Sequence, residues 1–398
     1  MSFADSNNLV PPHGGKLVCL LVNDKEKQER LKEAESFIKV SLSSLEVSDL
    51  VMLAIGAFSP LQGFMGKEDY ERVVKEMRLK NGIVWPIPIT LSTSKENASQ
   101  IKEGQEISLI DPERNEITAT MSVHEKYTYN KKREASYVFG TDDEKHTGVK
   151  KVYSQGDIYL GGPIEVLSEG GYPERFPEYA RPKETRALFT EKGWKSIAAF
   201  QTRNPIHRSH EYLTKIALEV CDGLFIHPIV GKLKPGDIPA EVRMECYKTL
   251  LDKYYPGDRV LLKVYPMEMR YGGPREAVLH AIIRQNFGCS HLIVGRDHAG
   301  VGDYYGPFDA QKIFEQFNSE DLHIKPLKAD WIFWCYKCES MASKKTCPHP
   351  DKDHLIISGT KLRGMLSQGK RPPKEFSRPE VIDILVSYYS SKNRGGNK

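Results

Sequence analysis

Apolar and polar positions alternate along residues 195–295 in a way that is typical of a parallel α/β sheet. Short apolar runs predict four buried strands, at residues 196–200, 223–230, 259–264 and 291–295. Longer runs with apolar residues at helical spacing predict three helices between them, at residues 207–220, 240–253 and 275–286. Buried strands that alternate with helices form βαβ units. We therefore predict a Rossmann-like nucleotide-binding domain in the centre of the chain.

The chain before residue 168 has shorter segments that are rich in β-branched residues and bounded by turn-forming residues. They predict strands at residues 83–91, 106–110 and 116–121. Helical patterns interrupt them at residues 26–34 and 67–77. This arrangement predicts a β-barrel-like or mixed α+β domain.

A third region begins after the central one. It starts with a compact Cys/His segment and continues with two helical patterns, at residues 360–368 and 379–390. The second pattern has a proline in its first turn and one apolar face, which consists of Val381, Ile382, Ile384, Leu385 and Tyr388. We expect a multidomain α/β protein with three domains, at residues 1–168, 169–328 and 329–398.

Composition narrows the class of protein. The 398 residues suit two or three domains, and the 57 basic residues are spread along the chain against 53 acidic ones. A net charge of +4 without a basic stripe argues against a nucleic-acid partner. No apolar run approaches the ~18–20 residues of a membrane span. The polar stretch Met1–Gly15 does not resemble a secretory signal, so we expect a cytoplasmic protein.

The seven cysteines fall into two groups. Four are scattered among apolar residues and are expected to be buried free thiols, namely Cys19, Cys221, Cys246 and Cys289. The other three, Cys335, Cys338 and Cys347, are clustered, and the first two have the spacing of a zinc knuckle. In a cytosolic chain such a cluster favours a metal site over a disulfide, although buried free thiols are the alternative.

His349 and His354 are the candidates for a fourth zinc ligand. We prefer His354 because the longer stretch from Cys347 lets the chain wrap around the ion. Four protein ligands leave no open position, so this zinc is expected to be structural.

The most informative stretch is Gln201–His210, with the sequence QTRNPIHRSH. It follows the first predicted strand, where ligands bind in open α/β sheets. Arg203 offers a planar fork of donors for an oxyanion, and Gln201 and Asn204 add neutral donors. Pro205 ends the strand, and the N-terminus of the next helix favours negative charge. We therefore predict a site for a polyanion.

His207 and His210 are three residues apart and share one face of the first helical turn. They can bind oxygens of a triphosphate and stabilise a departing pyrophosphate. Alternatively, they cap the helix or pack on a neighbour. A zinc site from this pair is less favoured, because neither an HExxH pattern nor a nearby acidic ligand is evident.

The string QTRNPxHxxH resembles the ATP sulfurylases, within the nucleotidyltransferase superfamily that includes class I aminoacyl-tRNA synthetases. Further strings support this resemblance from about residue 50 to 390, namely 56–65, 85–89, 161–163, 270–277, 295–300 and 358–363. The resemblance implies a PUA-like N-terminal domain, a Rossmann-like nucleotidyltransferase domain and a small C-terminal α/β domain. It also implies a homodimer, and some bacterial members carry zinc at a similar place.

The implied reaction joins sulfate to the α-phosphate of ATP by direct in-line attack, which gives adenylyl sulfate (APS) and pyrophosphate. It activates sulfate or, in reverse, forms ATP. Sulfate is fully ionised at neutral pH, so the reaction needs no general base. The site must instead position two anions and supply donors where charge develops. No carboxylate cluster for Mg²⁺ is evident, so we expect Mg²⁺ to arrive with ATP.

The resemblance implies a role for each site residue. Gln201, Arg203 and the backbone of Ala299 would hold sulfate. Thr202 and Asn204 would contact the phosphates and the attacked phosphorus. His207 and His210 would stabilise the transition state and the leaving group. The residues expected to bind ATP are Gln201, Asn204, His207, His210, Gly295, Arg296, Asp297 and His298.

Several alternatives stay open at this point. The 295–298 string can be a tight surface turn with an ion pair, and Arg270 and Arg275 can be ordinary arginines at a helix start. Lys361 and Arg363 are not assigned to the site.

Two other functions also stay open. A tRNA-modifying or aminoacylating enzyme should show a basic surface and a KMSKS-like loop. A sulfate- or nucleotide-sensing module would not need both histidines together with Arg203. A P-loop is absent, so we expect no fused APS kinase domain.

Overall fold

The computed structural model describes residues 9–232, 237–357 and 359–395. Ser358, which begins the string 358–363, and the first eight residues of Met1–Gly15 lie outside the described residues. Among the helices that can be described, none is both long and apolar enough to cross a membrane.

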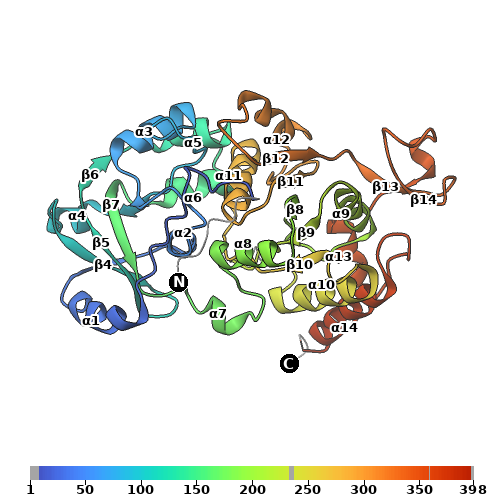
Figure 1. The fold of residues 1–398 in the computed structure, drawn as a ribbon, viewed down its shortest axis with the longest axis horizontal. Helices are drawn as coiled ribbons and strands as arrows, with labels where there is room; N and C mark the ends of the chain where they lie inside the picture. Colours follow the sequence, from blue (N-terminus) through green and yellow to red (C-terminus); the bar gives the residue numbers. More distant parts are fainter. Residues whose placement is uncertain (1–8, 233–236, 358, 396–398) are drawn as a thin grey trace.

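The N-terminal domain is built on a seven-stranded sheet (Figure 1). Its strands are β1 (Ile38–Ser41), β2 (Gly63–Phe64), β3 (Leu91–Thr93), β4 (Glu106–Asp111), β5 (Glu116–Ser122), β6 (Glu125–Thr128) and β7 (Ile158–Val166). The long strand β7 pairs with β2, β3, β5 and β6 and so holds the sheet together. The helices are α1 (Asp24–Ala34), α2 (Ser44–Ala54), α3 (Lys67–Glu76), α4 (Lys95–Gln100), α5 (Lys131–Phe139) and α6 (Thr147–Ser154).

The strand predicted at residues 83–91 is wrong for most of its length. Only Leu91 belongs to a strand, β3, and Val84 makes an isolated bridge. The segment between them contains Pro86 and Pro88, which have no backbone N–H to donate to a ladder. Trp85, Ile87 and Ile89 are nevertheless buried. The apolar pattern of residues 83–91 thus indicates that these side chains are buried, but it does not indicate that the segment pairs in a sheet.

The central domain contains a parallel sheet with the order β10-β9-β8-β11-β12. Its strands are β8 (Ile197–Phe200), β9 (Gly223–Ile226), β10 (Val260–Leu262), β11 (His291–Val294) and β12 (Lys325–Lys328). The chain proceeds outward from β8 to β10 and then returns to β11 on the other side of β8. This reversal creates a switch point at the carboxyl ends of β8 and β11, where such sheets bind ligands.

The Rossmann-like prediction is confirmed, with one strand missed. The helices α9 (Arg208–Val220), α10 (Ala240–Tyr254) and α11 (Gly273–Asn286) match the predicted ranges closely. The missed strand, β12, has the sequence KPLK, whose proline and charged ends do not look like a buried strand. It lies at the edge of the sheet, where a proline is tolerated.

The C-terminal region has a small antiparallel sheet and two helices. The sheet contains β13 (Ile332–Cys335), β14 (Ser340–Ser343) and β15 (His354–Leu355), and the β13–β14 hairpin projects from the body of the molecule (Figure 1). The helices are α13 (Gly359–Ser367) and α14 (Pro379–Gly395). The remaining elements are α7 (Tyr172–Arg175), α8 (Pro182–Glu191), α12 (Asp309–Lys312) and the short 3₁₀ helices Ile313–Gln316 and Asp351–Asp353.

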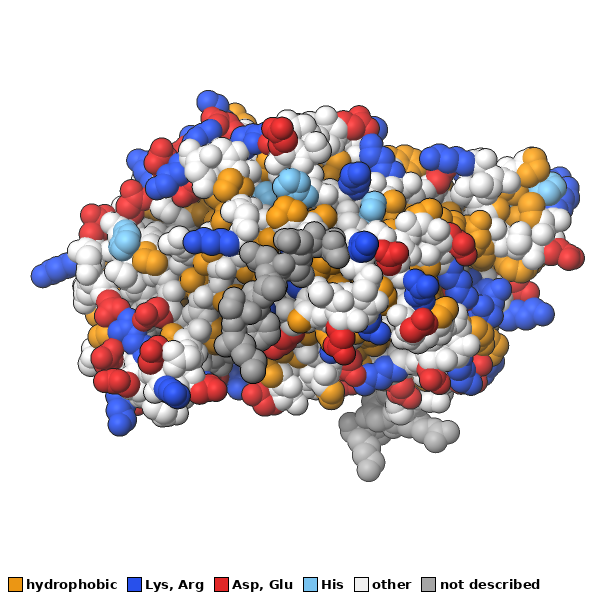
Figure 2. All heavy atoms as spheres, viewed as in Figure 1, with side chains coloured by type: hydrophobic (Ala, Val, Ile, Leu, Met, Phe, Trp, Pro, Cys, Tyr) orange, Lys and Arg blue, Asp and Glu red, His pale blue; other side chains and the backbone are white. Residues whose placement is uncertain are grey.

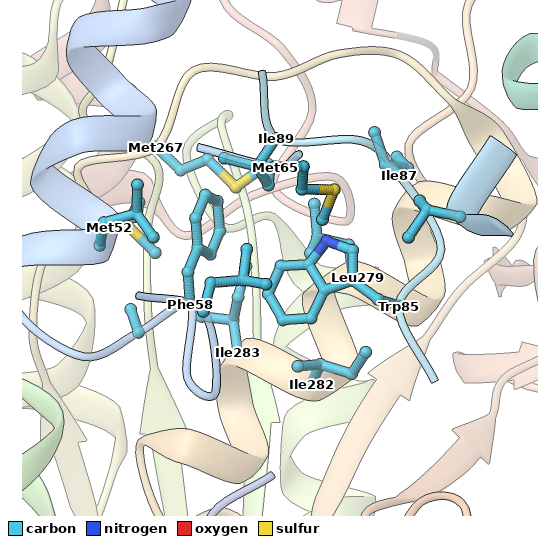
Figure 3. Packing of buried hydrophobic residues seen from close by; sticks show 14 of the residues in the cluster. Met52, Phe58, Met65, Trp85, Ile87, Ile89, Met267, Leu279, Ile282 and Ile283 are labelled. Atoms are coloured by element: carbon cyan, nitrogen blue, oxygen red, sulfur yellow. The ribbon is translucent and has the colours of Figure 1, made fainter. Parts of the chain in front are cut away.

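The N-terminal and central domains share one hydrophobic core. Helix α11 is buried on all sides from Glu276 to Asn286. Its residues Leu279 and Ile282 pack in one cluster with Phe58 and Trp85 of the N-terminal domain (Figure 3). In contrast to this apolar core, the surface seen in Figure 2 carries a mixture of basic and acidic side chains. The two domains are therefore joined through α11.

The scattered cysteines match the prediction with one correction. Cys221, Cys246 and Cys289 are buried free thiols, but Cys19 is exposed. Cys19 lies in the extended segment that precedes α1, where its Sγ is 3.6 Å from the carbonyl oxygen of Ile55.

Candidate active site

A cavity of about 520 Å³ opens at the carboxyl ends of β8 and β11. All eleven residues predicted to bind ATP or sulfate line it, namely Gln201, Thr202, Arg203, Asn204, His207, His210, Gly295, Arg296, Asp297, His298 and Ala299. The third region of the chain completes its wall with Trp331, Trp334 and Phe376. The predicted site residues thus converge on one cavity.

The turn after β8 is closed by the Thr202 side chain. The Thr202 hydroxyl accepts a hydrogen bond from the Asn204 N–H at 3.1 Å and donates one to the Asn204 carbonyl at 2.8 Å. Tyr247 donates to the same carbonyl at 2.8 Å. The Thr202 hydroxyl therefore fixes the shape of the turn, while the side chain of Asn204 lines the cavity.

Arg203 is held by an aromatic side chain. Its Nη1 donates to the Tyr271 hydroxyl at 2.8 Å, and its guanidinium carbon lies 5.3 Å from the centre of the Tyr271 ring. The second contact is a cation–π interaction. Tyr271 was not among the predicted site residues.

His207 and His210 form a stacked pair at the start of α9. His207 is the N-cap residue, and the two rings lie 3.8 Å apart at an angle of 24°. The Nδ1 atom of each ring is buried without a hydrogen-bond partner among the described residues. Burial lowers the pKa of His210 to about 4 and that of His207 well below its usual value. Both rings are therefore neutral donors at pH 7 when no nucleotide is bound.

A hydrogen-bonded chain of side chains supports Gln201 from behind. The Gln201 amide nitrogen lies 3.1 Å from Nδ1 of His280, which lies 3.1 Å from Nε2 of His298. On the other edge of the His280 ring, Nε2 is 3.4 Å from a carboxylate oxygen of Glu276. Because Nε2 then carries the proton donated to Glu276, Nδ1 is free to accept from the Gln201 amide.

The loop after β11 combines a strained backbone with an ion pair. Asp297 and Ala299 have φ angles of 52° and 57°, in the left-handed region that few non-glycine residues adopt. Arg296 is paired with Asp297 at 2.8 Å, and its guanidinium lies 4.2 Å from the centre of the Trp331 ring. The ion pair of the alternative interpretation is therefore present, but the residues 295–298 also line the cavity.

Arg270 and Arg275 do not line the cavity. The Arg270 side chain forms a buried ion pair with Asp49 of α2. Arg275 donates to three carbonyl oxygens of the N-terminal domain, those of Val73, Val74 and Pro86. These two arginines tie the central domain to the N-terminal domain.

The clustered cysteines form a metal-ligand set at the end of the β13–β14 hairpin. The sulfur atoms of Cys335, Cys338 and Cys347 and Nδ1 of His349 all lie within 4.8 Å of one another. The three sulfurs lie 3.5, 3.2 and 3.7 Å from that nitrogen. A tetrahedral zinc ion with three sulfur ligands and one nitrogen ligand requires separations of roughly 3.6–3.8 Å. The four residues therefore fit zinc.

The preference for His354 as the fourth ligand is corrected by this geometry. Its Nε2 contacts Cys347 at 3.5 Å, but the ring stacks on Phe333 at 3.7 Å and its Nδ1 faces Asp351. His354 belongs to β15, opposite Cys335 in the small sheet, and this pairing places it beside the ligand set. His349, the alternative candidate, lies inside the set, at a bend two residues after Cys347.

Comparisons with known proteins show which families this chain resembles. A family model described as ATP-sulfurylase matches residues 178–388, and one described as a PUA-like domain matches residues 10–169. A sulfate adenylyltransferase of Pelodictyon phaeoclathratiforme is 55% identical over 387 residues, covering 96% of each chain. One of Entamoeba histolytica is 53% identical over 393 residues, covering 96% of this chain and 93% of the relative.

A solved structure has the same fold over most of the chain. It is described as a hexameric APS kinase from Thiobacillus denitrificans, with a TM-score of 0.75 and 25% identity. The match covers 95% of this chain and 68% of that one.

Proposed function

Because the chain belongs to the ATP sulfurylase family and is a sulfate adenylyltransferase, we propose that sulfate attacks the α-phosphorus of ATP directly in the cavity beside β8 and β11. The observation that carries this proposal is the convergence of all eleven predicted residues on that cavity. They come from two separate loops, at the two sides of the switch point. One loop can then hold the anions while the other holds the nucleoside.

Sulfate is held by Gln201, Arg203 and the backbone of Ala299. Arg203 supplies the positive charge and a planar fork of donors, which match a tetrahedral oxyanion. The amide of Gln201 is oriented by His280, so its direction is set before sulfate binds. These contacts bring one anion against another, and positioning of this kind is the main contribution that the reaction needs.

His207 and His210 act on the phosphates. Their neutral rings present donors to the triphosphate, and the negative charge that develops on the departing pyrophosphate strengthens those bonds. Asn204 contacts the phosphates through its side chain, and Thr202 acts by shaping the turn that carries Asn204. Gly295, Arg296, Asp297 and His298 line the site of the ribose and adenine. Mg²⁺ arrives with ATP and neutralises charge on its phosphates.

Substitution of the histidines tests this role. His207→Ala and His210→Ala should each lower kcat more than they raise the KM for sulfate, because the interaction they remove is strongest in the transition state. Steady-state kinetics with both substrates varied will show the split. A variant that lost only sulfate affinity would contradict the assignment.

Other properties follow from the family resemblance. We propose zinc as the metal of the Cys335–Cys338–Cys347–His349 set, a homodimer, and a cytoplasmic enzyme whose other four cysteines are free thiols. We also propose domain limits at residues 168/169 and 328/329. Sedimentation of the purified protein will give the oligomeric state.

The reaction itself is tested by pyrophosphate release. Purified protein with ATP and Mg²⁺ should release pyrophosphate only when sulfate is added. Molybdate should replace sulfate and yield AMP continuously, since its mixed anhydride with AMP hydrolyses. If pyrophosphate appeared with neither sulfate nor molybdate present, or if sulfate gave none, the proposed direct attack would be wrong.

A further inference from the structure

The turn Arg270–Gly273 lies between the N-terminal domain and the cavity, and its backbone is strained. Tyr271 is buried and has a φ angle of 62°. An aromatic residue rarely adopts this left-handed conformation, and it persists only where surrounding contacts impose it.

Glu276 imposes the conformation from the first turn of α11. One carboxylate oxygen accepts the N–H of Arg270 and the other accepts the N–H of Gly272, both at 2.9 Å. The carboxylate thus grips the backbone on both sides of Tyr271. Tyr305 adds a third restraint, since its hydroxyl donates to the Tyr271 carbonyl at 3.1 Å.

The restrained turn contacts both parts of the proposed sulfate site. The Tyr271 hydroxyl accepts the hydrogen bond from Arg203 at 2.8 Å. Two residues further on, the N–H of Gly273 donates to the carbonyl of Ala299 at 3.1 Å. Gly273 has a φ of 50°, and a Cβ at this position would lie 2.7 Å from the Tyr305 ring. One turn therefore sets the position of both Arg203 and Ala299.

We infer that Tyr271 and Glu276 are positioning residues for sulfate. Tyr271 acts through the guanidinium of Arg203, and Glu276 acts by holding the turn that carries Tyr271. This inference rests on the proposed role of Arg203 in holding sulfate. The affinity for sulfate then depends in part on the Glu276 carboxylate, although Glu276 does not line the cavity.

Tyr271→Phe removes the hydroxyl and keeps the ring. A hydrogen bond to a charged group contributes enough to change affinity by about tenfold. We therefore expect the KM for sulfate to rise about tenfold, while kcat and the affinity for α,β-methylene ATP, measured by titration calorimetry, change less than twofold. A general structural defect would instead weaken nucleotide binding as well.

Tyr127→Phe is the matched control. Tyr127 is also buried, and its hydroxyl donates to the Met65 carbonyl at 2.7 Å within the N-terminal domain. Its loss should lower the melting temperature but leave the KM for sulfate unchanged. An equal rise in this KM for both variants would overturn the inference.

Glu276→Gln tests the two hydrogen bonds that hold the turn. The glutamine amide keeps one oxygen as an acceptor, but its NH₂ group points a donor at the other backbone N–H. The KM for sulfate should rise, again with little change in nucleotide affinity. If the variant does not fold, Tyr305→Phe removes a weaker restraint on the same turn and should give a smaller rise. If no folded variant of the turn shows a rise in this KM, the inference is wrong.

The double variant Arg203→Lys with Tyr271→Phe separates the two proposals. If Tyr271 acts through Arg203, the double variant should bind sulfate no worse than Arg203→Lys alone. An additive loss would overturn the inference. If Arg203→Lys itself kept the wild-type KM and kcat, the proposed role of Arg203 would fail instead.

Discussion

At the scale of single residues, the neutral state of the two active-site histidines stands out. Both rings are kept from protonation by burial, and they are stacked on each other. The fixed positive charge closest to the proposed sulfate position is therefore Arg203. Neutral rings bind the pyrophosphate product less strongly than two imidazolium ions would, so they hinder its release less.

Arg203→Lys should lower kcat/KM for sulfate by roughly 10²-fold or more, which corresponds to about 3 kcal/mol. Lysine retains the charge, but it cannot present a planar fork and cannot make the same contact with Tyr271. The measurement is initial-rate kinetics of pyrophosphate release, with circular dichroism to show an unchanged fold. A rate close to wild type would refute the role of Arg203 in holding sulfate.

His210→Gln should make the protein less sensitive to acid. The pKa of His210 is about 4 in the folded chain, below its ordinary value of 6.5. Between pH 4 and 6.5, His210 is therefore protonated in the unfolded chain but stays neutral in the folded chain. This group therefore lowers stability as the pH falls from 6.5 to about 4. We expect the loss of unfolding free energy between pH 7.5 and 5 to be ~1–2 kcal/mol smaller in the variant.

Denaturant titrations of wild type and variant at both pH values will measure this difference. His124→Gln, at an exposed position outside the cavity, is the control and should leave the loss unchanged. Equal acid sensitivity of His210→Gln and wild type would mean that the folded protein protonates His210 as readily as the unfolded chain does.

At the scale of elements, the β13–β14 hairpin combines a metal-ligand set with part of the cavity wall. Ile332 and Trp334 of β13 line the cavity, and Cys335 follows them directly. Among the described residues of this hairpin, only Phe333, Cys335 and Ala342 form a buried apolar cluster. So few buried side chains do not hold a hairpin in place by themselves, and we expect the proposed metal ion to supply the missing stability.

Purified protein should contain about one zinc per chain, and Cys338→Ser should lose it and melt at a lower temperature. Folded Cys338→Ser should keep its kcat, but its KM for ATP should rise a few-fold because Trp334 lines the cavity. Metal analysis, calorimetry and kinetics will measure the three effects. Metal-free wild-type protein with unchanged thermal stability would rule the site out.

The fourth ligand is decided by a matched pair of variants. His349→Ala should lose zinc, whereas His354→Ala should keep it and lose only the stacking on Phe333. The opposite result would restore the first preference for His354.

The sequence predicts elements and sites well where neighbouring residues determine them. The predicted site residues of QTRNPIHRSH reach one cavity because the turn itself places them there. Tyr271, Glu276 and His280 were missed because they act through contacts with residues distant in sequence, and in isolation they look like ordinary positions near a helix. The structure favours His349 over the preferred His354 for a reason of the same kind, since the orientation of the His354 ring depends on β15 and Phe333.

At the scale of the whole molecule, the N-terminal domain takes part in building the active site. Asp49 of α2 pairs with Arg270, the first residue of the turn that carries Tyr271, and both side chains are only 4% exposed. The chain of contacts Asp49–Arg270–Tyr271–Arg203 thus runs from the first domain to the proposed sulfate site.

Asp49→Ala should lower the free energy of unfolding by about 3–5 kcal/mol, because it leaves the Arg270 charge buried without a partner. It should also raise the KM for sulfate. The control is Glu113→Ala, which breaks the exposed interdomain pair with Lys232 and should cost less than about 1 kcal/mol. Equal effects of the two substitutions on unfolding would show that the buried pair is not special.

Helix α11 has a consequence for how the chain is synthesised. The end of the helix is fastened by residues made long before it: Asn286 donates to the carbonyls of Ala57 and Ser59 and accepts from the N–H of His13. During translation the N-terminal domain emerges first and can fold as a unit. Residues 273–286 then leave the ribosome before β11 and β12 have emerged, so the first surface available to α11 is that of the N-terminal domain. We therefore expect the first domain to act as a template for the folding of the second, and α11 should be among the slowest helices to exchange its amide hydrogens with solvent.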